Sequence, residues 1–490
     1  MTETAAATPR PNRVAIALGT AIDAVMLGAA AFGLYLWLGQ ETVYSDGYTF
    51  LLGTQNRRYS HPFHPGYMPL ARQLLQTLRP HGFGQYEIFR LLSQLGVALG
   101  VVLTAVGLRV VGLDRARVRL ATAWVAVTPA VVFFATVVEV HGAFFAAASL
   151  AWLAAACLWR RPSITAAVAL GLLTAGATLM HASGVLLPLP LLLLFVAAPP
   201  HRLDVSPLKR RLRLAAVALL VHGVGYGLSV WTTRSLGARV EPGTAAGFVA
   251  GLAEHVRSAQ HFAEVAWSEW LWPFATASLT WWLCFCRRGQ RRLGLGLLGA
   301  LAVYLPAAAL VLSLGPERGA YLLPLAVPAA ALGVAALPRR VAQAAVLISL
   351  ALAVAGVWSH DERDAARAFR RGVHAAVAPY KPFVLVGDPA EVEACLVANL
   401  EFIVVLDSSF LLGGQNEKIR RGFDRHLRNR IADGYRVLLT ESADAQMRDE
   451  EVLAAFPPAA TWTTHLRATY DFDRVPGRHR AFQGWRLTPR

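Results

Sequence analysis

Long apolar stretches separated by short polar connections run through the first 358 residues of the chain. A helix needs about 20 apolar residues to cross about 30 Å of hydrocarbon, and most of these stretches approach that length. The pattern predicts about eleven membrane-spanning helices, the first of them uncleaved because its apolar run is too long for a signal peptide. We expect them near residues 14–38, 88–111, 120–138, 143–158, 164–180, 184–198, 214–232, 270–285, 293–314, 321–337 and 341–358.

Two connections between the predicted spans are long, at about residues 40–87 and 234–269. Apolar residues recur in the first at helical spacing, for example Leu70, Leu74 and Leu78. Such periodicity in a segment too polar to cross a membrane predicts helices that lie along the membrane surface.

The last part of the chain, residues 359–490, has a different pattern. Short apolar runs at 383–386, 402–406 and 435–439 are typical of strands, and apolar residues every four positions from 419 to 431 predict a helix. Asp388 followed by proline is a helix start. We therefore predict a small soluble α/β domain with a partly parallel sheet, after a multi-span transmembrane domain at residues 1–358.

Composition supports this division. Of 490 residues, 55% are hydrophobic and only 16% charged, which excludes an ordinary soluble protein. Residues 1–358 hold 28 Lys and Arg against 13 Asp and Glu, whereas residues 359–490 hold 19 against 18. Four cysteines are too few and too buried in apolar runs to cross-link the tail. A basic excess in an apolar body indicates membrane topology before it indicates nucleic acid, and we expect no nucleic-acid partner.

The basic residues also predict orientation. If the spans alternate, the basic connections all fall on one side, and the opposite short turns contain one basic residue, Arg318. The positive-inside rule then places the amino terminus in the cytoplasm and, after eleven spans, the tail outside. A multi-pass protein of a bacterial inner or plasma membrane is expected.

Candidate chemistry lies at the predicted outer ends of the spans. Carboxylates near hydrocarbon are costly and usually functional, and Asp46 follows the first span closely. The run 57–67 contains Arg57, Arg58, His61 and His64, with two prolines and a glycine that fix a loop shape. The alternative is a solvated loop in which proline and glycine only end helices.

Two short outer turns carry ionisable residues as well. Glu139 and His141 share the turn between the third and fourth spans, and face either headgroups or a cavity between helices. Arg318 either binds a phosphate or extends into lipid headgroups. His181, His222 and Asp23 stand alone in the sequence, and packing between helices is the favoured role for each.

Four motifs together resemble the membrane-embedded GT-C glycosyltransferases, in particular the protein O-mannosyltransferase and aminoarabinose-transferase-like branch. These motifs are the aspartate of Tyr44-Ser45-Asp46-Gly47, the run from His61 to Leu70 containing His64-Pro65-Gly66-Tyr67, the turn Val138-Glu139-Val140-His141, and Arg318 to Pro324 before a late span.

The resemblance implies an enzyme that takes a sugar from a polyprenyl-phosphate carrier on the non-cytoplasmic side, with a glycan, lipid or protein as acceptor. Asp46 occupies the position of the catalytic base, and direct attack on the anomeric carbon would invert its configuration. Arg57, Arg58 and Arg318 are candidates for binding phosphate. The remaining candidates, expected to shape the substrate site or to hold a divalent cation, are His61, His64, Tyr67, Glu139, His141 and Tyr321.

Two other classes of protein fit an apolar multi-span chain. A transporter or lipid flippase usually has repeated halves and ionisable groups near the middle of the bilayer. Here the ionisable groups concentrate at the predicted outer face, which favours the enzyme. A non-catalytic scaffold for the tail would not need Asp46 or the histidine loop.

Overall fold

The computed structural model describes most of the chain. The described residues are 13–40, 43, 47, 50–51, 64–197, 208–235, 263–279, 299, 301–302, 304, 318–358, 363–398, 400–405, 416–455, 459–475 and 482–490. The chain divides into two compact units. The first comprises Met1–Gly39, Tyr44–Pro80 and Ile88–His360, and the second comprises Gln40–Val43, His81–Glu87 and Asp361–Arg490.

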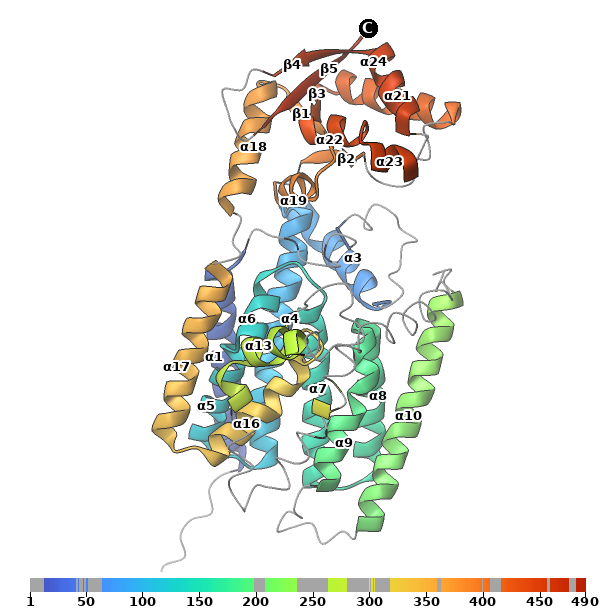
Figure 1. Ribbon diagram of the computed structural model, residues 1–490. Coiled ribbons are helices and arrows are strands. Elements are labelled where there is room, and N and C mark those ends of the chain that lie inside the picture. Colours follow the sequence, from blue (N-terminus) through green and yellow to red (C-terminus); the bar gives the residue numbers. More distant parts are fainter. Residues whose placement is uncertain are drawn as a thin grey trace, which may run out of the picture. The chain divides into compact units, whose positions relative to one another are not determined.

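The first unit is helical, and its longer helices lie side by side in Figure 1. Its main helices are α1 (Arg13–Trp37), α3 (Tyr67–Leu78), α4 (Gln85–Val111), α5 (Arg115–Ala126), α6 (Pro129–Thr136), α7 (His141–Arg160), α8 (Ile164–Met180), α9 (Pro188–Ala197), α10 (Leu208–Ser235), α13 (Trp272–Phe274), α16 (Ala326–Ala336) and α17 (Arg339–Trp358). Shorter 3₁₀ turns are η1 (Arg79–His81), η2 (Ala182–Leu186) and η6 (Leu323–Leu325), and a π-helical turn η3 (Ala266–Leu271) precedes α13.

Within the described residues, five helices are long and apolar enough to cross a membrane, namely those at Leu18–Trp37, Gln85–Val111, His141–Arg160, Leu208–Ser229 and Arg339–Trp358. Their outward faces carry large apolar side chains such as Leu220, Trp231 and Leu347, which are more than half exposed. An apolar surface of this kind needs lipid around it. The chain is therefore an integral membrane protein. The expected spans at 270–285 and 293–314 lie mostly outside the described residues, so the expected total of eleven stays a prediction.

The third expected span, at residues 120–138, is broken in the structure. Helices α5 and α6 meet at a bend of 58°, and counting them as one span raises the described total to six. Pro129 begins α6, while Thr128 before it is extended at ψ 131°. Proline donates no backbone hydrogen bond and disfavours helical backbone in the residue before it, so the helix stops and restarts in a new direction.

A charged contact joins α1 to α5. The Asp23 carboxylate accepts hydrogen bonds from Arg115, at 2.5 and 2.9 Å, and from Arg119 at 2.6 Å. This bidentate arrangement gives an aspartate in an apolar helix a partner on the neighbouring helix. The structure thus gives Asp23 the packing role favoured by the sequence.

The second unit contains the α/β fold expected for the tail. Its elements are α18 (Arg363–Val377), β1 (Lys381–Val386), α19 (Pro389–Val397), β2 (Glu401–Val404), α21 (Glu417–Ala432), β3 (Tyr435–Thr440), α22 (Glu441–Gln446), α23 (Glu450–Ala455), α24 (Ala459–Thr469), β4 (Tyr470–Arg474) and β5 (Gly484–Pro489).

The five strands form one sheet in the order β2-β1-β3-β5-β4. Strands β2, β1 and β3 are parallel, with Val384 opposite Phe402 and Leu438, and β5 and β4 are antiparallel additions. Buried side chains of the strands pack against Trp462 of α24 and Leu427 of α21. The predicted partly parallel sheet is present, because short apolar runs separated by helices favour parallel pairing through crossovers.

Local sequence starts and ends the tail helices where it was expected to. The Asp388 side chain accepts from the backbone of Ala390, and Glu391 reaches back to the backbone of residues 387 and 388, which forms a capping box before α19. Helix α21 ends at Ala432, and Gly434 follows its C-cap with a φ of +84°, which glycine adopts without strain.

Candidate functional site

Three histidine rings contact one another inside the first unit. His181 lies between the other two, with ring centroids 4.6 Å from His64 and 4.5 Å from His141. All three side chains are buried. Removing an imidazole from water costs free energy unless polar partners compensate for the lost hydration. A buried group of three is therefore a candidate for ligand binding or proton transfer.

The end of α8 positions two of these rings. His181 directly follows Met180, the last residue of α8, and its Nδ1 lies 2.7 Å from the Ser183 hydroxyl. The loop that carries His64 contacts the same end of α8, because Gly66 donates its backbone N–H to the Leu179 carbonyl oxygen at 2.8 Å. A Cβ at Gly66 would lie 3.0 Å from the Leu179 carbonyl oxygen, so glycine favours the close approach of the His64-Pro65-Gly66-Tyr67 loop to the end of α8.

A buried carboxylate lies beside the histidines. Glu139, 1% exposed, sits between α6 and α7, with its Oε1 at 3.4 Å from His141 Nδ1. Its Oε2 accepts the backbone N–H of Gly47 at 2.9 Å. One carboxylate thus contacts both the histidine group and the loop that follows α1, and a negative charge so far from water interacts strongly with each.

A glycine contact between α4 and α7 brings this carboxylate close to α4. A Cβ at Gly142 would lie 2.5 Å from the Ser93 carbonyl oxygen, and one at Gly96 would lie 2.6 Å from the backbone of Gly142. At this close approach the Ser93 hydroxyl donates to the Glu139 carbonyl at 2.9 Å. The small residues are therefore what allow α4 to support the Glu139 turn.

Aromatic side chains enclose the cluster. The Tyr321 ring lies 5.6 Å from the His181 ring, and the Tyr67 ring lies 4.6 Å from that of Phe50. Burial, and secondarily the charge of Glu139, raise the pKa of Tyr67 well above its usual range. Tyr67 therefore keeps its proton and remains a hydrogen-bond donor.

Arg318, which precedes Tyr321 by three residues, has an unusual backbone conformation. Its φ is +53°, in the left-handed region that non-glycine residues rarely adopt. The fully buried Glu269 accepts the backbone N–H groups of Arg318 at 2.8 Å and of Gly319 at 2.7 Å. The guanidinium lies over the Phe133 ring at 4.8 Å, a cation–π contact. Strain of this kind persists only where the surroundings enforce it, and it concentrates at functional sites.

The structure brings together most of the expected site residues that it describes. His64, Tyr67, Glu139, His141 and Tyr321 meet around His181. Arg318 contacts Phe133, whose neighbour Phe134 packs against His141 at 4.6 Å. Four further candidates, Asp46, Arg57, Arg58 and His61, lie outside the described residues.

The sequence reasoning missed two residues. His181 stands alone in the sequence, which favours a packing role, yet in the structure it lies at the centre of the histidine cluster. Glu269 received no role, although a carboxylate in the aromatic run Trp267 to Trp272 was a usable signal.

The divalent cation expected from the sequence would need several side-chain ligands directed at one point. Within the described residues, no group of three or more His, Cys, Asp or Glu side chains is arranged to hold a metal ion. In the histidine cluster the His64 ring stacks on that of His181, at an interplanar angle of 26°, and the His141 ring is tilted by 45° against it. The described part of the site therefore does not fit a metal.

Comparison with known proteins identifies solved structures that have a similar fold. The sequence matches neither a protein-family model nor a curated protein. Its structure is similar to the crystal structure of ArnT from Cupriavidus metallidurans in the apo state, at 14% identity and a TM-score of 0.53, covering 96% of this chain and 98% of that one. ArnT bound to undecaprenyl phosphate gives 14% identity and a TM-score of 0.54, over 94% and 97%.

A more distant likeness is to the Archaeoglobus fulgidus oligosaccharyltransferase in complex with zinc and sulfate, at 13% identity and a TM-score of 0.44, over 95% of this chain and 72% of that one. The two ArnT structures, each with a TM-score above 0.5, show which fold this chain shares. At this level of identity the likeness establishes a shared fold over nearly the whole chain, so the fold expected from the resemblance to aminoarabinose-transferase-like proteins is confirmed.

Proposed function

We propose that the chain is a membrane glycosyltransferase that moves a sugar from a polyprenyl-phosphate carrier to an acceptor on the non-cytoplasmic face. One observation carries the proposal. Buried Glu139 accepts the backbone N–H of Gly47, the residue after Asp46, beside a cluster of three histidines in an ArnT-like fold. Since one of the ArnT structures holds undecaprenyl phosphate, a polyprenyl phosphate is the donor carrier that the likeness favours.

In the proposed reaction, an acceptor hydroxyl attacks the anomeric carbon of the donor sugar. Asp46 takes the hydroxyl proton as the new carbon–oxygen bond forms, and the bond from that carbon to the phosphate oxygen breaks. Polyprenyl phosphate leaves with the bonding electron pair. A single displacement of this kind inverts the anomeric configuration.

Glu139 is proposed to position the base. Asp46 and Gly47 are joined by one peptide bond, so a hydrogen bond from Gly47 to a buried carboxylate restrains the backbone beside Asp46. His64, His141 and Tyr321 are proposed to shape the sugar and acceptor site around His181.

The departing phosphate requires positive charge. Arg318 is the described candidate, because Glu269 fixes its backbone and Phe133 fixes the guanidinium plane. Arg57 and Arg58, from the same outer loop as Asp46, are proposed to act with it. Guanidinium groups match phosphate oxygens with paired hydrogen bonds, which suits a leaving phosphate.

The lipid part of the donor needs an apolar path between helices. A cavity of about 160 Å³ between α4, α7, α9 and α16 is lined almost entirely by apolar side chains, including Leu103, Trp152 and Phe195. We propose that part of the isoprenoid chain can occupy it. A transporter or flippase would also bind lipid, but neither the strained Arg318 nor the Glu139 contact has a role in passive passage.

The deciding experiment is a transfer assay. Purified protein in detergent is supplied with a labelled polyprenyl-phosphate-linked sugar and a mixture of membrane lipids and glycans, and labelled product is measured. A transporter or flippase forms no labelled product, because it neither makes nor breaks the bond to the sugar. In Asp46→Asn we expect transfer to fall by about 10²–10⁴-fold, the usual contribution of a general base.

The control for that assay is Asp433→Asn, which alters an exposed carboxylate in the tail and should leave transfer unchanged. Equal activity of Asp46→Asn and the unaltered protein, with both intact by size-exclusion chromatography, would refute the assignment of the base.

A further inference from the structure

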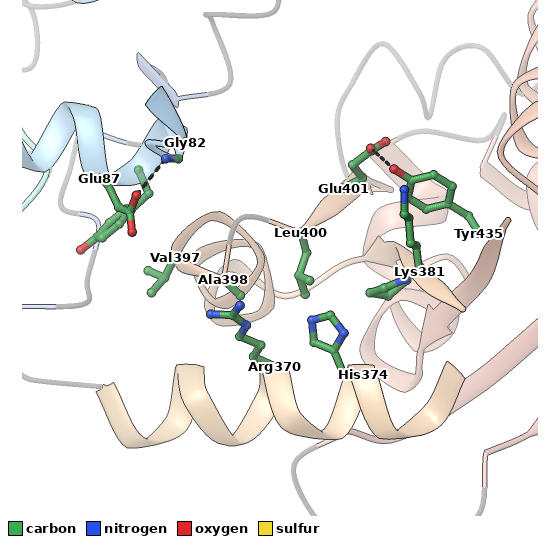
Figure 2. Close-up of a pocket in the computed structure, with 13 residues that line it drawn as sticks. Gly82, Glu87, Arg370, His374, Lys381, Val397, Ala398, Leu400, Glu401 and Tyr435 are labelled. Atoms are coloured by element: carbon green, nitrogen blue, oxygen red, sulfur yellow. Dashed lines mark hydrogen bonds between the residues drawn. The ribbon is translucent and has the colours of Figure 1, made fainter. Parts of the chain in front are cut away.

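A polar cavity lies in the second unit, apart from the histidine cluster. Its volume is about 370 Å³, within the range of about 300–1,000 Å³ that is usual for small-molecule sites. Every residue that lines it belongs to the second unit, either to the segment His81–Glu87, which includes the first three residues of α4, or to the chain after Asp361. Figure 2 shows this cavity above helix α18.

Three basic side chains line the cavity. Arg370 and His374 are four residues apart on α18, so they project from one face of the helix, and Figure 2 shows both pointing into the same space. Lys381 joins them from the first residue of β1. Arg370 and Lys381 keep their charge at any physiological pH.

The two carboxylates in the lining are already engaged. Glu87 accepts the backbone N–H of Gly84 at 2.8 Å. Glu401 accepts the Tyr435 hydroxyl at 2.5 Å and pairs with Arg430, which is not part of the lining, at 2.8 Å. Arg430 offsets the Glu401 charge, so the remaining lining is positive on balance. Partial burial, and next the charge of Arg370, lower the pKa of His374.

We infer that this cavity binds an anionic saccharide, with the phosphate or carboxylate of the sugar held by Arg370 and Lys381. The anionic half of the inference stands on the cavity itself. Charged donors bind oxyanions about twice as strongly as neutral donors do, and backbone at Gly82 and Gly84 lets a ligand approach closely. The saccharide half rests on the proposed glycosyltransferase function.

The test is binding of four probes to the full-length protein in an uncharged detergent, measured by isothermal titration calorimetry. The probes are glucose 6-phosphate, glucuronate, glucose and inorganic phosphate. We expect at least one charged sugar to bind at least tenfold more tightly than both glucose and inorganic phosphate. Preference for the phosphate or the carboxylate sugar identifies the source of the anion.

Two neighbouring arginines on α18 provide a matched pair of variants. Arg370→Gln should weaken charged-sugar binding by about tenfold or more, because a charged hydrogen bond is lost. Arg371→Gln removes the same charge from the next position, which does not line the cavity, and should leave affinity unchanged. Lys381→Gln should behave like Arg370→Gln, with Lys418→Gln as its control.

Several outcomes would overturn the inference. Equal affinity for glucose and the charged sugars would contradict binding of the anionic group. Equal affinity for inorganic phosphate and the charged sugars would contradict recognition of the saccharide. Equal weakening in Arg370→Gln and Arg371→Gln would show a general charge effect. The transfer assay with Asp46→Asn is independent of these results, so failure of the proposed function and failure of this site are distinguishable.

Discussion

At the scale of single residues, two buried carboxylates organise the first unit. Glu139 and Glu269 each accept backbone N–H groups from a distant part of the chain, Gly47 in one case and residues 318 and 319 in the other. A buried carboxylate that accepts such bonds is stable only while its partners stay in place. Each therefore fixes a loop that carries a proposed functional residue.

Glu269→Gln tests this for the Arg318 turn. Glutamine keeps one acceptor oxygen but presents an NH₂ group to the second backbone N–H, which loses its partner at a cost of about 1–3 kcal/mol. We expect a lower melting temperature and transfer reduced by roughly tenfold or more, since Arg318 is no longer held. The exposed Glu264→Gln on the same segment should alter neither quantity. Unchanged transfer in Glu269→Gln would separate Glu269 from the site.

The cavity of the second unit offers a pH test at the same scale. His374 faces Arg370, Lys381, Glu87, Glu401 and Tyr435, and its pKa is below the ordinary value, so it is neutral near pH 7. A bound anion favours the protonated imidazole and raises that pKa. Affinity for glucuronate, whose carboxylate stays ionised, should therefore increase as the pH falls from about 7.5 to about 5.5.

His374→Gln should abolish this dependence while leaving binding at the higher pH nearly unchanged. Calorimetry in two buffers of different ionisation enthalpy measures the proton taken up on binding. An unaltered pH profile in the variant would assign the dependence to another group.

At the scale of elements, the site depends on how closely helices approach. Gly96 and Gly142 let α4 and α7 touch backbone to backbone, and Gly66 lets the histidine loop touch the end of α8. The Pro129 break redirects α6, so that Phe133 faces Arg318 and Phe134 faces His141. Small residues and one proline therefore determine which side chains meet.

Gly142→Ala tests the close contact of α4 and α7. The new Cβ would lie 2.5 Å from the Ser93 carbonyl oxygen, so the helices must separate, which costs about 1–3 kcal/mol. We expect a lower melting temperature and reduced transfer. The control is Gly176→Ala on α8, where a Cβ meets nothing within 4 Å and alanine should be tolerated or stabilising by up to about 1 kcal/mol. Equal behaviour of the two variants would contradict the role of this contact.

At the scale of the whole molecule, an apolar, outward-facing surface surrounds the first unit, while the second unit has a sheet with its own core. The long helices need lipid, and the tail domain needs water. The basic connections between the spans then decide on which side of the membrane the tail lies, which we propose to be the non-cytoplasmic side.

Cysteine labelling tests that orientation. Arg340 at the start of α17 and Lys418 in the tail are both exposed, and α17 lies between them in the chain. In a background without Cys157, Cys284 and Cys286, a membrane-impermeant maleimide added to intact cells should label Lys418→Cys but not Arg340→Cys. Both should react after the cells are permeabilised. The reverse pattern would invert the proposed topology and place Asp46 in the cytoplasm.

The sequence by itself predicted the long apolar helices, three strands of the α/β sheet and the short turn that holds Glu139 and His141. Each depends on local periodicity, on proline and glycine at helix ends, or on the distribution of charge along the chain, and these are visible without a fold. The motifs also indicated an aminoarabinose-transferase-like fold, and the likeness to ArnT confirms that fold.

Only the tertiary structure decided which of these residues meet. His181 joins His64 and His141, and Glu269 holds Arg318, although each pair is far apart in the sequence. Helix bends and glycine contacts set such meetings, and their geometry depends on the packing of every neighbouring helix. Hydrophobic pattern places a residue at the end of a helix, but the three-dimensional packing of the helices selects its partners.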